Sequence, residues 1–226
     1  IKAIHRCRYI DRPTFIRCNA RSADITATVN CLNSLGADIK FVDGGISVKP
    51  IKEKRKSAVL DCNESGSTIR FLLPVAASLG TNTEFTGGGR LPERPLSPLR
   101  EQMEAHGVVF SPINVFPVKI NGKMISGEFT IKGNISSQFI TGLLFALPLL
   151  NGNSIINVIP PVESRPYIDM TLNTLKKFGI TVTEKSNSFF IPGGQKYASP
   201  GTVESEGDWS NSAFFLTAGA VSGRVT

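Results

Sequence analysis

Small hydroxyl residues gather immediately before three apolar runs of the chain. A helix needs only one side-chain hydroxyl to cap its first turn, yet each run is preceded by two or more. They are Ser65, Ser67 and Thr68 before the first run, Ser136 and Ser137 before the second, and Ser210 and Ser212 before the third. Converging helix N-termini expose N–H groups and partial positive charge, and so form an anion site. The surplus hydroxyls therefore predict a ligand-binding rim, with Gln138 beside them as donor and acceptor.

Two arginines occupy Arg-Pro turns in front of amphipathic stretches. Arg94 lies in "GGGRLPERPLSPL" and Arg165 lies in "ESRPYIDM". The planar, permanently charged guanidinium suits a carboxylate or a phosphate. An ion pair between Arg94 and Glu93 is the structural alternative. Because the same Arg-Pro motif precedes two amphipathic stretches, we favour a functional role in anion binding for both arginines.

The elements that position these residues repeat three times. One marker is a helix-stopping glycine followed by two β-like runs, at Gly36, Gly107 and Gly179, in steps of 71 and 72 residues. A second marker ends each apolar run, at Gly80, Gly152 and Gly223, in steps of 72 and 71. Two independent markers with one period predict three equivalent structural units.

Each unit is expected to combine two kinds of helix with a hairpin. The apolar runs predict buried helices, whereas the other helices keep a polar face for solvent. The polar faces carry Asn30, Asn33, Glu101, Glu104, Lys176 and Lys177. Strand pairs such as "IKFVDGGISV" predict hairpins. The predicted fold is an α/β (α+β) domain, an inverse α/β barrel of three similar repeats with buried helices and outer sheets.

Composition narrows the function further. The chain has 226 residues and is 41% hydrophobic, which suffices for the core of one large domain or two small ones. Its formal net charge is +7. The basic residues are dispersed, so a small anionic ligand is favoured over nucleic acid. The sequence has neither a membrane-span pattern nor a signal-peptide pattern. Cys7, Cys18, Cys31 and Cys62 lack CxxC spacing, so we expect free thiols in the cytoplasm and no metal site.

From about residue 24 onward, the ordered motifs resemble those of 5-enolpyruvylshikimate-3-phosphate synthases. These motifs are "NESGSTIRFLLP", "LPERPLSPL", "GNISSQFITGLL", "ESRPYIDMTLNTLKKFG" and "EGDWSNSAFFL". The resemblance implies an inverse α/β barrel and transfer of the enolpyruvyl group of phosphoenolpyruvate to the 5-hydroxyl of shikimate 3-phosphate. It implies no metal or organic cofactor. The implied pathway is aromatic amino acid biosynthesis, in which glyphosate competes for the phosphoenolpyruvate site.

The family's shikimate 3-phosphate site maps onto five positions of this chain. Ser136 and Ser137 match its tandem serines, and Gln138 matches the glutamine between the two substrates. Ser164 matches a ligand of the shikimate phosphate, and Tyr167 matches a wall of that pocket.

The resemblance also assigns residues beside phosphoenolpyruvate and at the N-terminus. Arg94 matches an arginine that clamps phosphoenolpyruvate, and Gly66 matches a glycine that leaves room for it. Arg6 corresponds to a ligand of the shikimate phosphate in the family's opening Ser-Lys-Ser-x-x-His-Arg-like motif. The segment "IKAIHRCRYI" departs from that motif, because Lys2 is one residue too close to Arg6 and Ala3 replaces Ser.

The family is about twice as long as this chain. Residues 1–226 therefore correspond to one of its two domains, whose partner supplies an acid/base carboxylate, a Lys and further Arg residues. We assign no catalytic residue here, and expect a monomer that needs its own second domain and is inactive without it. One alternative is the related UDP-N-acetylglucosamine enolpyruvyl transferase, which places a Cys before its Arg-Pro, whereas "GGGRLPERP" has none. The other is a non-catalytic anion-binding domain.

Overall fold

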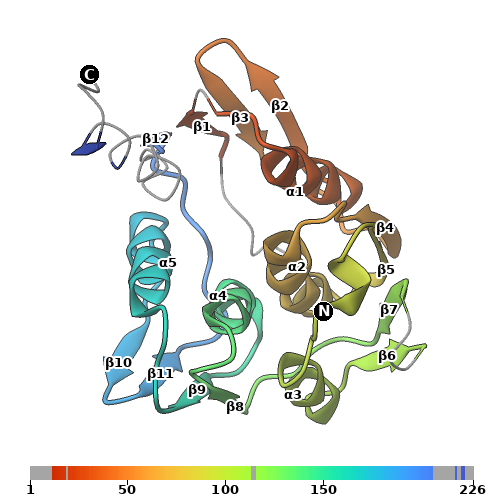
Figure 1. Cartoon of the computed structure of the whole chain (residues 1–226), viewed down its shortest axis with the longest axis vertical. Helices are drawn as coiled ribbons and strands as arrows, with labels where there is room; N and C mark the ends of the chain where they lie inside the picture. The colour runs from red at the N-terminus through yellow and green to blue at the C-terminus, as the bar shows by residue number, and fades with distance from the viewer. Residues whose placement is uncertain (1–11, 19, 113–115, 206–216, 218–219, 222–226) are drawn as a thin grey trace, which may run out of the picture.

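The computed structural model describes residues 12–18, 20–112, 116–205, 217 and 220–221 (Figure 1). Its α-helices are α1 (Ala23–Ser34), α2 (Gly66–Leu79), α3 (Leu99–Ala105), α4 (Ser137–Ala146) and α5 (Arg165–Lys177). Two short 3-10 helices are η1 (Leu91–Glu93) and η2 (Leu147–Leu149). The strands are β1 (Thr14–Arg17), β2 (Asp38–Val42), β3 (Gly45–Lys49), β4 (Ser57–Asp61), β5 (Asn82–Thr86), β6 (Val109–Ser111), β7 (Val118–Asn121), β8 (Glu128–Lys132), β9 (Ser154–Ile159), β10 (Thr183–Lys185), β11 (Ser188–Ile191) and β12 (Thr202–Glu204).

The described strands form three four-stranded sheets with one shared plan. In each sheet an edge strand pairs in parallel with its neighbour, which then pairs antiparallel with a hairpin. The orders are β12-β1-β3-β2, β4-β5-β7-β6 and β8-β9-β11-β10. The first sheet is closed by strands from opposite ends of the described chain, β1 and β12. This repeated topology confirms the predicted three-unit inverse α/β barrel.

Glycines end the three half-exposed helices in the way that the repeat predicts. Gly36, Gly107 and Gly179 have φ angles of +110°, +87° and +74°, a region that side chains rarely adopt. Each glycine turns the chain out of its helix and toward a hairpin. The predicted hairpin of "IKFVDGGISV" is present, with Asp43 and Gly44 connecting β2 to β3 while Gly45 already belongs to β3.

The buried helices lie at the centre and the sheets lie at the periphery (Figure 1). α2 and α4 are buried on nearly every side, whereas α1, α3 and α5 expose one polar face. Asn33 corrects the expected pattern, because its amide donates to the carbonyl of Ile39 at 3.0 Å and accepts from the Ile39 N–H at 2.8 Å. It therefore ties α1 to β2 and does not belong to the solvent face. The third apolar run, residues 210–223, lies almost wholly outside the described residues.

The two buried helices come into close backbone contact at Gly142 of α4. A Cβ atom placed there would lie 2.3 Å from the carbonyl oxygen of Arg70 and 3.3 Å from the Cα of Phe71 in α2. Around this contact the side chains of Phe139, Leu143 and Leu73 are completely buried. Only glycine permits this separation, so Gly142 fixes how the two helices sit against each other. Among the described helices, none is long and apolar enough to cross a membrane.

We expect Gly142→Ala to destabilise the protein by about 1–3 kcal/mol, because the added methyl group meets backbone that cannot move independently of its helix. Chemical denaturation measures the change. Gly88→Ala is the matched control, since a Cβ there would have no atom of the described structure within 4 Å. Equal unfolding midpoints for the two variants would contradict the close contact.

Candidate functional site

A cavity of about 590 Å³ lies where α2, α4 and α5 begin. All five residues that the sequence assigns to the shikimate 3-phosphate pocket line it, although they come from two helices and their preceding turns. Its polar lining consists of Ser67, Arg70, Ser136, Ser137, Gln138, Thr141, Ser164, Tyr167, Thr171 and Thr174. Phe71, Ile135, Phe145 and Met170 supply the apolar part of the wall. The cavity thus combines helix starts with hydroxyls, an amide and a guanidinium.

At the start of α4 only one of the three polar side chains caps the helix. Ser136 is the N-cap and its Oγ accepts the N–H of Gln138 at 3.2 Å. Ser137 is 9% exposed, and its hydroxyl has no hydrogen-bond partner among the described residues. The side-chain oxygen of Gln138 accepts from Arg70 at 2.8 Å. Capping therefore explains Ser136 alone, and Ser137 is left available to a ligand.

The start of α5 lacks the usual side-chain cap. Ser164 occupies the N-cap position with φ +57° and ψ +34°, and its side chain caps no N–H of the helix. Its hydroxyl faces the same cavity as Ser137. Tyr167 follows in the first turn and is 55% exposed. An uncapped helix start, a hydroxyl and a phenol are together well suited to receive a negatively charged oxygen.

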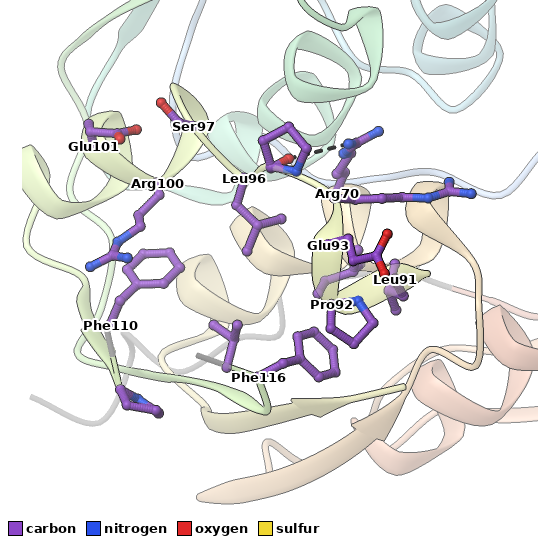
Figure 2. A pocket seen from close by; sticks show the side chains of 15 residues that line it. Arg70, Leu91, Pro92, Glu93, Leu96, Ser97, Arg100, Glu101, Phe110 and Phe116 are labelled. Atoms are coloured by element: carbon purple, nitrogen blue, oxygen red, sulfur yellow. Dashed lines mark hydrogen bonds between the residues drawn. The ribbon is translucent and has the colours of Figure 1, made fainter. Parts of the chain in front are cut away.

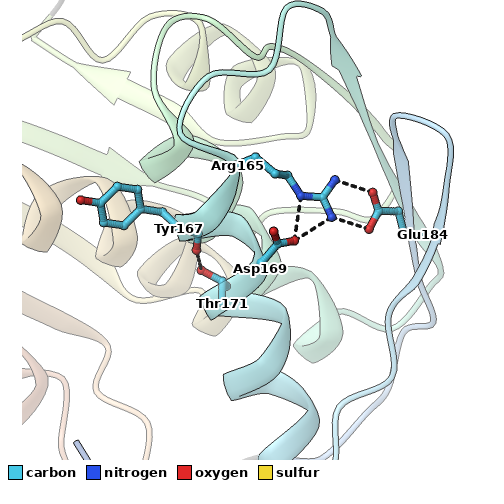
Figure 3. A network of polar contacts seen from close by, with 5 residues as sticks. All are labelled: Arg165, Tyr167, Asp169, Thr171 and Glu184. Atoms are coloured by element: carbon cyan, nitrogen blue, oxygen red, sulfur yellow. Dashed lines mark hydrogen bonds and ion pairs between the residues drawn. The ribbon is translucent and has the colours of Figure 1, made fainter. Parts of the chain in front are cut away.

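Arg165 is not available to an anion, which corrects the functional role favoured for it from sequence. Its guanidinium donates to both carboxylate oxygens of Glu184, at 2.6 and 2.8 Å, and to Asp169 at 2.7 Å (Figure 3). These contacts, first with Glu184 and then with Asp169, raise the pKa of Arg165 above its usual value. Arg165 instead braces the first turn of α5 against β10, and thereby holds Ser164 and Tyr167 beside the cavity.

Arg94 has the opposite environment. It is exposed and forms no ion pair with any residue that the structure describes, while Glu93 pairs with Arg90 at 3.5 Å. A Cβ on Gly66, the first residue of α2, would lie 2.6 Å from Nη1 of Arg94. The missing side chain of Gly66 therefore leaves room for the guanidinium at a helix start, where an anion is favoured.

Arg94 lines a second cavity of about 260 Å³. η1, the following loop, α3, β6 and β7 surround this cavity, and Figure 2 shows lining side chains such as Arg70, Leu91 and Phe110. Arg70 lines both cavities. The sequence interpretation left Arg70 out, although a charged residue inside an apolar helix signals buried partners. Ser67 was noted there as a surplus hydroxyl but was not assigned to the site. Arg6 lies outside the described residues.

The larger cavity can bind an anion, and the phenol of Tyr167 is the only common proton-transfer group in its described lining. Its described lining contains no Asp, Glu, His, Lys or Cys. No cluster of three or more His, Cys, Asp or Glu side chains in the described parts of the chain is arranged to hold a metal ion. Hydroxyls, an amide and helix N–H groups recognise phosphate and carboxylate oxygens. Binding is therefore the chemistry that these residues support on their own.

Residues 11–226 match the family model described as EPSP synthase (3-phosphoshikimate 1-carboxyvinyltransferase). The chain belongs to the EPSP synthase family. It is 40% identical over 206 residues to a 3-phosphoshikimate 1-carboxyvinyltransferase of Brachyspira hyodysenteriae, covering 91% of this chain and 48% of the relative. A relative with the same name from Clostridium kluyveri is 41% identical over 208 residues, with 91% and 49% covered.

Solved structures support the fold of this EPSP synthase family member. An EPSP synthase from Acinetobacter baumannii superposes with a TM-score of 0.76 at 20% sequence identity, covering 94% of this chain and 48% of that chain. A likeness at this identity concerns the fold alone. The chain spans about half the length of the curated relatives it matches.

We expect Gly66→Ala to displace the Arg94 side chain while leaving the fold intact. The new methyl group meets only the far end of a flexible side chain, so the free energy of unfolding should change by less than about 1 kcal/mol. Arg94 should move away from the start of α2, as seen in a crystal structure of the variant. An unmoved Arg94, or loss of several kcal/mol of stability, would contradict this account of Gly66.

We expect Arg165→Gln to lower the affinity of the larger cavity for inorganic phosphate although Arg165 does not line it. The neutral amide cannot keep the bidentate contact with Glu184, so the start of α5 loses its brace. Titration monitored by NMR chemical shifts measures the affinity. Arg17→Gln removes an exposed pair with Glu204 on another sheet and should leave phosphate binding unchanged. An identical phosphate affinity for Arg165→Gln and the native chain would contradict the bracing role.

Proposed function

We propose that this chain supplies the shikimate 3-phosphate-binding half of an enzyme that transfers the enolpyruvyl group of phosphoenolpyruvate to the 5-hydroxyl of shikimate 3-phosphate, releasing phosphate. The observation that carries the proposal is the cavity at the starts of α2, α4 and α5. It gathers Ser136, Ser137, Gln138, Ser164 and Tyr167 in a chain that belongs to the EPSP synthase family. Shikimate 3-phosphate presents a phosphate, a carboxylate and hydroxyls, which such groups recognise.

In this proposal phosphoenolpyruvate binds next to the first substrate, near Gly66 and Arg94. The exposed guanidinium of Arg94 pairs with an anionic group of phosphoenolpyruvate, and the glycine keeps the start of α2 open to it. Gln138 would contact the first substrate, and it is linked to the second region by its hydrogen bond with Arg70, which lines both cavities. Glyphosate, a small phosphonate and carboxylate anion, would compete for the same place.

Catalysis requires groups that the described cavity does not contain. Enolpyruvyl transfer needs a proton delivered to the methylene carbon of phosphoenolpyruvate and a proton removed from the shikimate hydroxyl. We propose that residues 1–226 form one of two domains, and that the second domain supplies these groups and excludes water when it closes. The functional unit is then a cytoplasmic monomer in which both domains face one cleft, with no organic cofactor, metal, nucleic-acid or membrane partner.

The two alternative functions differ from this proposal in measurable ways. A UDP-N-acetylglucosamine enolpyruvyl transferase would select a nucleotide sugar and not shikimate 3-phosphate, and membership in the EPSP synthase family favours the latter. A non-catalytic anion-binding domain would bind phosphate and shikimate 3-phosphate with similar affinity. Calorimetry that compares the affinities for shikimate 3-phosphate, UDP-N-acetylglucosamine and phosphate distinguishes the three functions.

We expect Ser136→Ala, Ser137→Ala and Ser164→Ala in combination to lower the affinity for shikimate 3-phosphate by at least about a hundredfold. The loss comes from Ser137 and Ser164, whose hydrogen bonds to the anion contribute roughly 1.5–3 kcal/mol each, while loss of the Ser136 cap loosens the start of α4. Isothermal titration of the 226-residue chain measures this loss. Ser22→Ala is the control, since Ser22 caps α1 away from the cavity. It should cost about 1 kcal/mol of stability without changing affinity. Ordinary binding by the triple variant would show that the pocket is misplaced.

We also expect the 226-residue chain alone to release no phosphate from phosphoenolpyruvate in the presence of shikimate 3-phosphate. The described lining of the larger cavity has no Asp, Glu, His, Lys or Cys to deliver or remove the protons that enolpyruvyl transfer requires. Activity should appear when the C-terminal half of a relative, such as the one from Clostridium kluyveri, is supplied in trans. Turnover by the chain alone would place the catalytic groups within these 226 residues.

A further inference from the structure

Arg70 contacts both sides of the wall that separates the two cavities. It extends from α2, and its Nη1 donates to Oε1 of Gln138 at 2.8 Å, while its Nη2 donates to the carbonyl of Pro95 at 3.2 Å. Figure 2 shows the second contact from the side of the smaller cavity. Gln138 belongs to the larger cavity and Pro95 follows Arg94 in the smaller one. One side chain therefore touches the parts of both cavities that would meet a ligand.

The contact with Arg70 determines which end of the Gln138 amide faces the ligand. A guanidinium has only donors, so Gln138 must present its oxygen to Arg70. Its NH₂ group is thereby left as a donor, and it has no partner among the described residues. A free amide donor beside Ser137 suits an anionic oxygen. Without Arg70 the amide could rotate and present its oxygen to the anion, which would be repulsive.

The contact with Pro95 fixes the loop that carries Arg94. Arg94 is the C-cap residue that follows η1, and its N–H donates to the carbonyl of Leu91. On the other side of Arg94 the Pro95 carbonyl is held by Arg70. The backbone of Arg94 is thus held on both sides while its side chain stays exposed.

The guanidinium groups of Arg70 and its neighbour Arg94 lack a counter-ion within the described structure. Arg70 makes no ion pair with a described carboxylate, and its Nε is buried without a hydrogen-bond partner. Burial, and next the positive charge of Arg94, lower the pKa of Arg70 from its usual value. Two neighbouring guanidinium groups repel each other, and an anion placed beside them removes that repulsion. The ring of Phe139, 5.2 Å from the Arg70 Cζ, compensates only part of the charge.

We propose that Arg70 is a positioning residue that couples the two anion pockets, by orienting the Gln138 amide toward one and holding the Arg94 loop at the other. The proposal rests on the proposed function, which names the ligands of the two pockets. It predicts that a change at Arg70 alters the binding of both substrates, and acts on shikimate 3-phosphate through Gln138. It also predicts that Arg70 adds little to stability, because its buried charge lacks a counter-ion.

The test is a double-mutant cycle in the 226-residue chain, with Arg70→Gln, Gln138→Ala and the double variant. Titration calorimetry measures the affinities for shikimate 3-phosphate and phosphoenolpyruvate, each alone and with the other present. Arg70→Gln should lower the affinity for shikimate 3-phosphate at least about tenfold, and it should also lower the affinity for phosphoenolpyruvate. In the Gln138→Ala background it should have little further effect on shikimate 3-phosphate. The unfolding midpoint should not fall.

Two further variants separate charge from geometry. Arg70→Lys keeps the charge but not the two-pronged donor set, so it should restore little of the lost affinity. Arg90→Gln is the matched control, since the Arg90 side chain is 86% exposed and its one partner among the described residues is Glu93, at 3.5 Å. This variant should bind both substrates as the native chain does. Additive effects of Arg70→Gln and Gln138→Ala, or full rescue by Arg70→Lys, would overturn the proposal.

Failure of the proposed function has a different signature. If the native chain binds neither substrate, the proposed function is wrong, and the positioning role is judged by NMR. Arg70→Gln should then shift both the Gln138 side-chain amide signals and the backbone amide of Leu96, whereas Arg90→Gln should shift neither. Unchanged Gln138 and Leu96 signals in Arg70→Gln would overturn the role of Arg70 independently of any ligand.

Discussion

The site depends on the close packing of two buried helices. At Gly142 the backbone of α4 meets the backbone of α2 at Arg70, at a distance that leaves no room for a side chain. This contact lies one turn after Gln138 in α4 and at Arg70 itself in α2. It therefore fixes the side chains that form the 2.8 Å hydrogen bond between the helices. From that contact the helix starts, with their hydroxyls and N–H groups, converge on one cavity.

Serines and arginines around this core have different roles because their neighbours differ. Ser136 satisfies the first turn of α4, whereas Ser137 and Ser164 cap nothing and face the cavity. Arg165 is held by Glu184 and Asp169 and braces the start of α5, whereas Arg94 pairs with no acid among the described residues and its exposed guanidinium can meet a ligand. A guanidinium or hydroxyl that is already satisfied stabilises structure, and one that is not satisfied can recognise a substrate.

Sequence predicts the fold well because its signals are local and repeated. The glycines that end helices, the apolar runs and the two-residue hairpin connection each depend on a few neighbouring residues, and they recur with one period. Ser67, Ser136, Ser137 and Ser164 also line one cavity, as expected of converging helix starts. Ser65 and Thr68 do not line it, because they bond to each other inside the first turn of α2. Arg165, Arg70 and Asn33 were not predicted correctly, because their partners come from other elements. Glu184 lies 19 positions from Arg165, and Gln138 lies 68 positions from Arg70.

The central claim is that hydroxyls left over from capping at converging helix starts form the binding site for a phosphorylated ligand. A crystal structure of the 226-residue chain with shikimate 3-phosphate tests it most directly. The account predicts that the ligand occupies the larger cavity, with its phosphate within hydrogen-bonding distance of Ser164 and its remaining oxygens near Ser137 and the Gln138 amide. A ligand bound outside this cavity, with Ser137 and Ser164 making no contact to it, would contradict the account.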